Sequence, residues 1–293
     1  MPSLQRTSPD LRLSGESGGH RDGERPLSTA RSKRMNGTVT VLDKGAVRIH
    51  SYMSPADTFH TTTQLIETPA RIIAIDAQLI PAYADEAVAY AKGLGKPLDR
   101  LIVTHAHPDH YNGAARFGVP VHALPQVREQ IVARGDSRLP TGVVIPLTEF
   151  TPTVDLTPGT EVVDGVPFVF EAVSGGEAAD ELLVKLPEQG VLVAQDLVYH
   201  DVHLYLGNND IAGWERALDL LAAQTGYDTI LAGHGLPTGP EVYADVRRYL
   251  ADARELLGDD GEAYKKAIVE RYPSLVGPFI IDIANRSLFG TVH

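Results

Sequence analysis

Short apolar runs rich in β-branched residues, broken by Asp, Gly and Pro, dominate the chain from Gly37 onward. Such runs predict strands, and longer segments with a three-to-four-residue apolar period predict helices. Residues 134–160 contain several prolines and little periodicity, which indicates a long surface connection or lid. Two successive sets of strands, each followed by helices, predict two sheets sandwiched between helical layers. The expected strands are 39–42, 47–52, 61–67, 71–75, 101–104, 161–163, 167–172, 182–186 and 191–194, and the expected helices are 81–92, 126–133, 211–223, 240–257, 262–271 and 279–288.

Residues 1–36 differ from the rest of the chain in composition. They are rich in Ser, Gly and Arg, with seven basic and four acidic side chains and almost no apolar periodicity. Such a segment buries too little apolar surface to fold alone, and it lacks the apolar region of a secretory signal. We therefore expect a disordered N-terminal tail over 1–36, with Met35 as an alternative start, and one folded domain over 37–293.

The composition excludes several kinds of site. The 293 residues include no cysteine, which rules out disulfides, thiolate zinc ligands and a cysteine nucleophile. A metal site must therefore use His, Asp and Glu. The formal net charge of −12 argues against nucleic acid or an anionic membrane face as the main partner, and no apolar run approaches the roughly 20 residues of a spanning helix. We expect a cytoplasmic protein that acts on a small molecule, with homo-oligomerisation left open.

Residues 104–110 are the strongest chemical signal in the chain. They read Thr-His-Ala-His-Pro-Asp-His and follow an apolar strand directly. Residues two apart in an extended segment project to the same side, so His105 and His107 can bind one metal ion together. Asp109 and His110 lie on the turn that follows and can reach a second ion about 3.5–4 Å away. The segment therefore predicts a metal site with room for two ions.

This motif resembles the signature of the metallo-β-lactamase superfamily of hydrolases, and the likeness covers roughly residues 39–238. The resemblance implies an α/β fold, a four-layer αββα sandwich with a helical C-terminal segment, and a dinuclear metal site along one edge of the sheets. It further implies that Asp196 bridges both metals and that His234 is the final ligand. Asp76 and Thr104 are then expected to orient the ligating imidazoles.

One position departs from the usual pattern of the superfamily. Most members have a third histidine for the first metal in a Gly-His motif before the bridging aspartate. This chain has no histidine between His122 and His200, and the corresponding residue is Glu177. Its surroundings are similar to the alkylsulfatase branch, in which a glutamate is a ligand; the alternative is a solvated acidic turn. The implied metal ligands are His105, His107, Asp109, His110, Glu177, Asp196 and His234.

The expected cofactors are two divalent metal ions. Zn²⁺ is the first choice, because two histidines and a glutamate form a ligand set that zinc hydrolases use. An extra carboxylate makes the site harder, so Mn²⁺ or iron becomes more competitive.

The segment after Asp196 is polar and aromatic, which predicts that it lines the pocket. His200 and His203 are candidates for protonating the leaving group or holding the substrate, with an ordinary surface loop as the alternative. Tyr111 follows the motif directly and can face the site or pack in the core. Asp109 is assigned a catalytic role besides metal binding. Only Arg286, near the C-terminus, is a candidate to hold a sulfate group.

These residues predict a metal-dependent hydrolase in which a metal-bridging hydroxide attacks an ester, lactone or related bond of a small molecule. A sulfate-ester hydrolase is one alternative, favoured by the glutamate but weakened because alkylsulfatases have additional C-terminal domains. A mononuclear iron redox enzyme of the same fold and a non-catalytic metal-binding module are the others. The Gly-x-Ser-x-Gly match at residues 15–19 lies in the polar tail with no strand before it, so it does not indicate a serine hydrolase.

Overall fold

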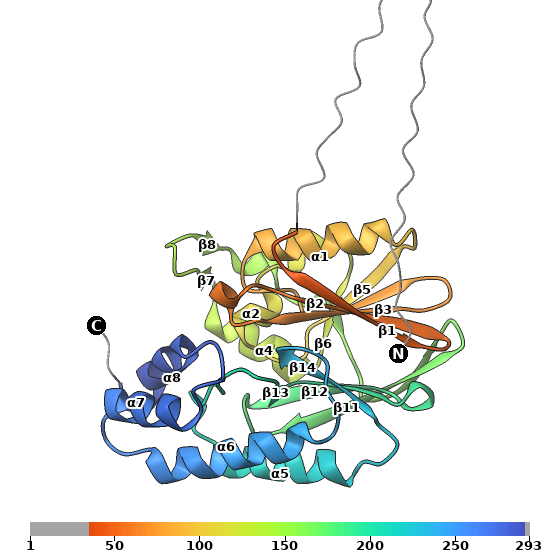
Figure 1. Cartoon of the computed structure of the whole chain (residues 1–293). Helices are drawn as coiled ribbons and strands as arrows, with labels where there is room; N and C mark the ends of the chain where they lie inside the picture. The colour runs from red at the N-terminus through yellow and green to blue at the C-terminus, as the bar shows by residue number, and fades with distance from the viewer. Residues whose placement is uncertain (1–34, 291–293) are drawn as a thin grey trace, which may run out of the picture. The chain divides into compact units, whose positions relative to one another are not determined.

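Two β-sheets lie face to face between helical layers in residues 35–290, the part of the chain that this computed structural model describes (Figure 1). The predicted tail lies outside the described residues up to residue 34. The backbone N–H groups of Asn36 and Gly37 donate to Glu86, at 2.9 and 3.0 Å. The predicted α/β sandwich is confirmed, and each predicted strand and helix corresponds to an element of the structure.

The first sheet contains seven strands and the second contains five. In spatial order, the first comprises β1 (Thr38–Lys44), β2 (Val47–Met53), β3 (Thr62–Glu67), β4 (Ile72–Ile75), β5 (Leu98–Ile102), β6 (Val121–Ala123) and β9 (Val154–Asp155). The second comprises β10 (Gly159–Val163), β11 (Val166–Ser174), β12 (Asp180–Leu186), β13 (Val191–Tyr199) and β14 (Thr229–His234).

Helices cover the outer face of each sheet (Figure 1). Helix α1 begins with a proline, a residue whose missing N–H costs nothing at a helix start, and it buries an alanine-rich face against the first sheet. Helix α5 packs against the second sheet beside α6, and Asp210 caps its first turn by accepting from the N–H of Gly213 at 2.8 Å. The longer helices are α1 (Pro81–Gly93), α4 (Pro125–Arg134), α5 (Ile211–Ala223), α6 (Val242–Leu256), α7 (Gly261–Arg271) and α8 (Phe279–Phe289). None of the described helices is long and apolar enough to cross a bilayer.

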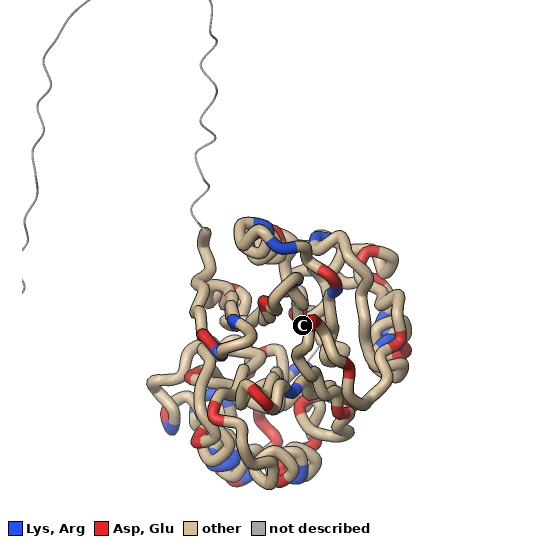
Figure 2. The backbone as a smooth tube through the Cα atoms, turned by 90° about the vertical axis from the view of Figure 1, so that its right-hand side faces the viewer, with Lys and Arg blue, Asp and Glu red and all other residues tan. Residues whose placement is uncertain are grey.

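The main core lies between the inner faces of the two sheets. Buried Ile49 and Leu65 of the first sheet belong to the same apolar cluster as Val184 and Val193 of the second. Burying apolar surface in this way contributes about 25 cal/mol per Å². In the view of Figure 2, basic residues lie among acidic ones along the described chain.

Parallel strand pairs bring the functional segments to one edge. β4 pairs in parallel with β5, and β13 with β14. The carboxyl ends of parallel neighbours meet at the same edge of a sheet, so the residues after β4 and β5 lie together, as do Asp196 and His234. The packing of the two sheets then places both sets at a common edge.

The predicted end of β13 was wrong. The apolar run stops at Ala194, but the strand continues through Gln195 and Asp196 to Tyr199, with register shifts around Gln195. Polar residues broke the sequence pattern, yet they remain buried because they belong to the candidate site. Where the sequence predicted a turn at Asp109 and His110, the structure has a short helix, α2 (Pro108–Tyr111), and α3 (Ala114–Phe117) follows it. The lid-like segment 134–160 is mostly irregular, with a small hairpin of β7 (Ser137–Arg138) and β8 (Val144–Ile145).

Glu67 is a buried carboxylate of the fold, away from that edge, and it gives a prediction for stability. It contacts His50 at 2.9 Å, Arg48 at 3.0 Å and Lys96 at 2.9 Å. Burial alone would raise the pKa of Glu67, but hydrogen bonds from Lys96 and His50 lower it to about 2. We expect Glu67→Gln to lower the free energy of unfolding at pH 7 by about 3 kcal/mol.

The pH dependence distinguishes this effect from a simple packing loss. A lowered carboxylate pKa stabilises the fold fully above the unfolded value, near 4.5, and this contribution disappears as the pH falls toward about 2. Urea unfolding at pH 7 and pH 3 should therefore show a smaller difference at pH 3. Glu188→Gln, at an exposed position, is the matched control. An equal loss at both pH values would contradict the electrostatic origin.

Candidate metal centre

The structure brings the predicted ligands together at the sheet edge in two groups. In each group, one ligand atom per residue lies within 4.8 Å of all the others. Ligands come from the segment after β5, from α2, from the β11–β12 connection, from β13 and from the end of β14. The first group is His105, His107, Glu177 and Asp196, and the second is Asp109, His110 and His234.

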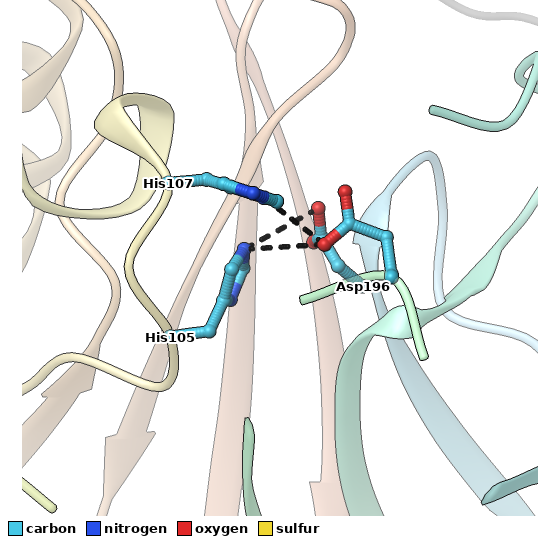
Figure 3. A group of neighbouring side chains, drawn as sticks. His105, His107 and Asp196 are labelled. Carbon is cyan, nitrogen blue, oxygen red and sulfur yellow. Dashed lines mark ion pairs between the residues drawn. The ribbon is translucent and has the colours of Figure 1, made fainter. Parts of the chain in front are cut away.

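The first group has the spacing of a tetrahedral metal site. His107 Nδ1 lies 3.0 Å from Glu177 Oε2, and His105 Nε2 lies 3.8 Å from the same oxygen. His105 Nε2 is also 3.6 Å from Asp196 Oδ2. In Figure 3 both imidazoles, which come from one loop, point toward the carboxylate of Asp196. Metal–ligand bonds of about 2.0–2.2 Å in tetrahedral geometry place neighbouring ligand atoms about 3.3–3.6 Å apart.

The second group shares Asp196 with the first. Asp109 Oδ2 lies 3.3 Å from His110 Nε2 and 3.4 Å from His234 Nε2. Asp196 Oδ1 lies 3.2 Å from His110 Nε2, and its Oδ2 lies 3.1 Å from His234 Nε2. The Asp196 carboxylate therefore faces both groups.

Outer partners fix the orientation of two of the imidazoles. Thr104 Oγ1 lies 3.0 Å from His105 Nδ1, and Asp76 Oδ2 lies 2.8 Å from His110 Nδ1. Asp76 also accepts from the N–H and hydroxyl of Thr104, both at 2.8 Å. A partner on Nδ1 leaves Nε2 of the same ring free for a metal, and Nε2 is the atom that faces the centre in both residues.

The backbone near the site adopts conformations that non-glycine residues rarely accept. Phe59 has φ 60, Asp76 has φ 61 and Gln195 has φ 41. The carbonyl of Phe59 accepts from Nδ1 of His234 at 2.9 Å, which orients that ring. At Gly233 an added Cβ would collide with the Asp196 carboxylate, so only glycine allows this approach. Strain of this kind costs of order 1–3 kcal/mol per residue and concentrates at functional sites.

Several buried polar atoms in the described residues make no hydrogen bond. They include Nε2 of His105 and His110, Oε2 of Glu177 and Oδ1 of Asp196. An unpartnered buried polar atom costs free energy and calls for an explanation. All four face the two groups described above, and imidazole nitrogens with carboxylate oxygens are a donor set that zinc, manganese and iron accept. The residues present therefore fit divalent metal ions.

Burial and neighbouring charges shift the pKa values of the carboxylates in opposite directions. Burial, with the carboxylates of Asp196 and Asp109, raises the pKa of Glu177 well above its usual value. Burial alone would also raise the pKa of Asp196, but the imidazoles of His110 and His234 lower it well below its usual value. Burial lowers the pKa of His107 to about 4, so this ring is neutral at pH 7. A divalent cation offsets the charge that the carboxylates would otherwise hold in a buried place.

A cavity of about 290 Å³ opens over the ligands. Candidate metal ligands of both groups form one part of its surface. The other walls come from α8 and from the start of the 134–160 segment. Apolar side chains form much of the remaining surface. The lining is His107, Asp109, Glu177, Asp196 and His234, with Phe59, Leu79, Pro108, Pro140, Ile280 and Ile283, and with Arg134, Ser137, Arg138, Tyr199 and Tyr205.

Three of the predicted catalytic candidates do not line this cavity. His203 is buried and its Nδ1 lies 3.0 Å from the hydroxyl of Tyr249. His200 places its Nδ1 3.0 Å from the carbonyl of Leu236. The reason is that β13 runs on to Tyr199, so the chain leaves the edge before these histidines. Tyr111 is buried in the main core, with its ring 4.8 Å from that of Phe150.

Sequence analysis predicted that the segment after Asp196 lines the pocket but assigned no role to its Tyr199 and Tyr205, and it gave no indication of Arg134 or Arg138; all four line the cavity. Tyr199 places its hydroxyl 3.0 Å from Asp196 Oδ2, and its ring stacks on His234 at 4.5 Å. Burial raises the pKa of Tyr199 well above its usual value, so the hydroxyl keeps its proton and donates. The sequence signal that could have identified Tyr199 is its position three residues after Asp196.

Comparison with known proteins identifies relatives in sequence. The metallo-beta-lactamase superfamily matches residues 73–234, more than half of the chain. An alkyl/aryl-sulfatase of Saccharomyces cerevisiae is 26% identical over 222 residues, which cover 59% of this chain and 34% of that protein. A linear primary-alkylsulfatase of a Pseudomonas species is 24% identical over 246 residues, covering 67% and 45%. The chain therefore spans less than half the length of these curated relatives.

Solved structures show the same fold. A metallo-beta-lactamase from Pontibacter korlensis has a TM-score of 0.59 at 21% identity, over 73% of this chain and 100% of that one. A mono-zinc metallo-beta-lactamase from Pseudomonas aeruginosa has a TM-score of 0.57 at 22% identity, over 74% and 96%. The family match, the fold and the ligand groups agree, and the chain belongs to the metallo-β-lactamase superfamily.

Proposed function

We propose that the chain is a dinuclear hydrolase that cleaves an ester, lactone or related bond of a small molecule. The observation that carries this proposal is the position of the Asp196 carboxylate, which lies between the two ligand groups. Oδ1 lies 3.2 Å from His110 Nε2, and Oδ2 lies 3.1 Å from His234 Nε2 and 3.6 Å from His105 Nε2. A carboxylate placed between two sets of donors is the arrangement that a pair of ions requires.

The residues divide naturally between the two ions. His105, His107 and Glu177 would hold the first, Asp109, His110 and His234 the second, and Asp196 both. Two divalent ions held there would lower the pKa of a shared water and would stabilise the attacking and leaving oxygens of the reaction. Zn²⁺ is the first choice for both. The extra carboxylate of Glu177 makes Mn²⁺ or iron more competitive with it.

The other residues of the cavity hold and orient the substrate. The Tyr199 hydroxyl is a fixed donor 3.0 Å from Asp196 Oδ2, close enough to donate a hydrogen bond to an oxygen of the reacting group. Phe59 and Ile280 supply apolar wall, which excludes water and strengthens the electrostatic interactions inside. In this role Tyr199 replaces His200 and His203 as the candidate donor.

A sulfate-ester hydrolase is the second candidate. The observations that favour it are the likeness to two curated relatives, both alkylsulfatases, and the carboxylate of Glu177 at 3.0 Å from His107. The chain spans less than half of those relatives, so their substrates are a hypothesis for this protein.

The test is a panel of chromogenic substrates measured with and without a chelator. The panel contains simple esters, lactones, a sulfate ester and a β-lactam. Chelator-sensitive turnover of esters or lactones supports the first proposal, and turnover of the sulfate ester alone supports the second. Bound iron with oxygen consumption would indicate the redox alternative. No chelator-sensitive turnover of any member would overturn both hydrolase proposals.

Replacement of Glu177 tests its role as a ligand. We expect Glu177→Ala to lower the metal content from two ions to about one per chain, because it removes a contact to both His105 and His107. We expect kcat/KM to fall by more than about 100-fold, since loss even of an outer partner of a metal ligand costs about 10–100-fold. Plasma spectrometry and steady-state kinetics measure the two effects. Glu188→Ala, at an exposed position, is the control. Two tightly bound ions with full activity would contradict the assignment.

A further inference from the structure

We infer that Arg134 and Arg138 form an anion-recognition site on the wall of the cavity. Preferred substrates would then carry a negatively charged group in addition to the ester bond that is cleaved. This inference rests on the proposed function and deepens it, because it names the substrate class. The pair is called the arginine wall below.

The arginine wall belongs to the segment that the sequence indicates as a lid. Arg134 is the last residue of α4, and Arg138 lies in β7. Between them Gly135 has φ 72, a conformation that favours glycine and turns the chain at the helix end. Both arginines, with Ser137, line the same cavity as the ligands Glu177 and Asp196.

The two guanidinium groups have no carboxylate partner within 4.0 Å among residues 35–290, whereas other arginines of this segment of the fold do. Arg128, also on α4, pairs with Asp155 at 2.9 Å, and Arg116 pairs with Asp85 at 2.7 Å. Arg138 makes one long contact, 3.5 Å to the carbonyl of Gly142. A guanidinium presents its donors in a fork that matches carboxylate and sulfate oxygens.

The acidic residue between the two arginines is engaged elsewhere. Asp136 accepts from the backbone N–H of Leu147 at 2.8 Å, so its carboxylate stabilises the connection rather than pairing with Arg134 or Arg138. In a chain with a net charge of −12, two unpaired cations beside a cavity are therefore a local exception. The donors of the arginine wall are available to an anionic ligand.

The remaining wall fits the uncharged part of such a ligand. Phe59, Leu79, Ile280 and Ile283 contribute apolar surface to the cavity, and the ring of Phe59 stacks on Phe279 at 4.3 Å. A volume of about 290 Å³ lies at the lower end of small-molecule sites, which span about 300–1,000 Å³. The cavity therefore suits a compact ester with one apolar part and one anionic group.

The test compares two esters that have the same leaving group and whose acyl chains differ only by one terminal carboxylate. One is 4-nitrophenyl butyrate, which is neutral, and the other is the 4-nitrophenyl monoester of glutaric acid, which ends in a carboxylate. We expect the metal-loaded enzyme to prefer the charged ester by about 10-fold in kcat/KM, because hydrogen bonds to charged groups are the strong ones. The preference should decrease as ionic strength rises, since both arginines are exposed.

Substitution of the arginine wall should remove this preference alone. In the double variant Arg134→Gln/Arg138→Gln we expect equal kcat/KM for the two esters. Arg216→Gln makes the same type of substitution, with loss of one positive charge, at an exposed position of α5 outside the cavity lining, and it should keep the full preference. Equal rates in the wild type, or a preference that survives the double substitution, would overturn the inference.

A separate measurement distinguishes failure of this inference from failure of the proposed function. If neither ester shows chelator-sensitive hydrolysis, the substrate panel decides whether the proposed function fails, and the arginine wall is then tested by binding. Calorimetric titration of the metal-loaded protein with monomethyl glutarate and with methyl butyrate should show tighter binding of the charged ligand to the wild type than to the double variant. Equal binding of monomethyl glutarate to both proteins would overturn the inference, because the metals are common to both.

Discussion

Asp196→Asn should lower kcat/KM by at least about 1,000-fold, because it removes charge at the point where both ligand groups meet. The Asp196 carboxylate lies 3.1 Å from His234 and 3.2 Å from His110. Asparagine keeps the shape but offers one oxygen and no charge, so it cannot serve two ions. We expect plasma spectrometry to find one ion or fewer per chain in the purified variant.

The control for this substitution is Asp201→Asn, which makes the same chemical change a few residues along the chain. The Asp201 side chain is 81% exposed and does not line the cavity, so activity and metal content should stay at wild-type values. Without metal, Asp196→Asn should be less stable than the wild type at pH 7, because His110 and His234, whose imidazoles lower the pKa of Asp196, lose the charge that they face. A variant with two bound ions and activity within tenfold of the wild type would refute the bridging role.

Removal of the metals should lower the melting temperature by about 10 °C or more. A ligand present at about 1,000 times its Kd stabilises a protein by about 4 kcal/mol, and each kcal/mol corresponds to about 2–4 °C for a chain of about 150–250 residues. The physical reason is local: the buried carboxylates of Glu177, Asp196 and Asp109 lose the cations that offset them. Differential scanning calorimetry of dialysed protein with and without chelator measures the shift.

Re-addition of the metal provides the internal control, since the original melting temperature should return. The double variant of the arginine wall should show the same shift as the wild type, because Arg134 and Arg138 belong to neither ligand group. Asp196→Asn should show a much smaller shift. Identical melting curves of the wild type with and without chelator would contradict a metal-filled site.

Much of the fold was predictable because single segments carry their own signals. Helix α5 spans the predicted residues, since Asp210 caps it and Trp214, Leu218 and Leu221 repeat along one buried face. The motif at 104–110 was equally informative, because this one short segment supplies both His105 and His110 to the metal centre. In both cases the local sequence pattern was enough to predict the feature.

The errors arose where burial and position depend on distant residues. The polar pair Gln195 and Asp196 ended the apolar run, although both are buried inside an irregular stretch of β13. That error moved His200 and His203 toward the cavity in the prediction. Arg134 and Arg138 gave no signal, because only the packing of α4 and β7 near the ligands shows that they share a cavity with them.

Asp76 has a consequence for how the enzyme tolerates change. It follows β4 of the first sheet, yet it accepts from Gln195 of β13 in the second and from His110 between them. A sliding of one sheet past the other by a fraction of an ångström would therefore rotate a metal-binding ring. Substitutions in the core between the sheets should alter metal affinity even when the protein stays folded. Engineering of substrate range is better directed at the exposed residues Arg134 and Arg138, which lie outside β4 and β13.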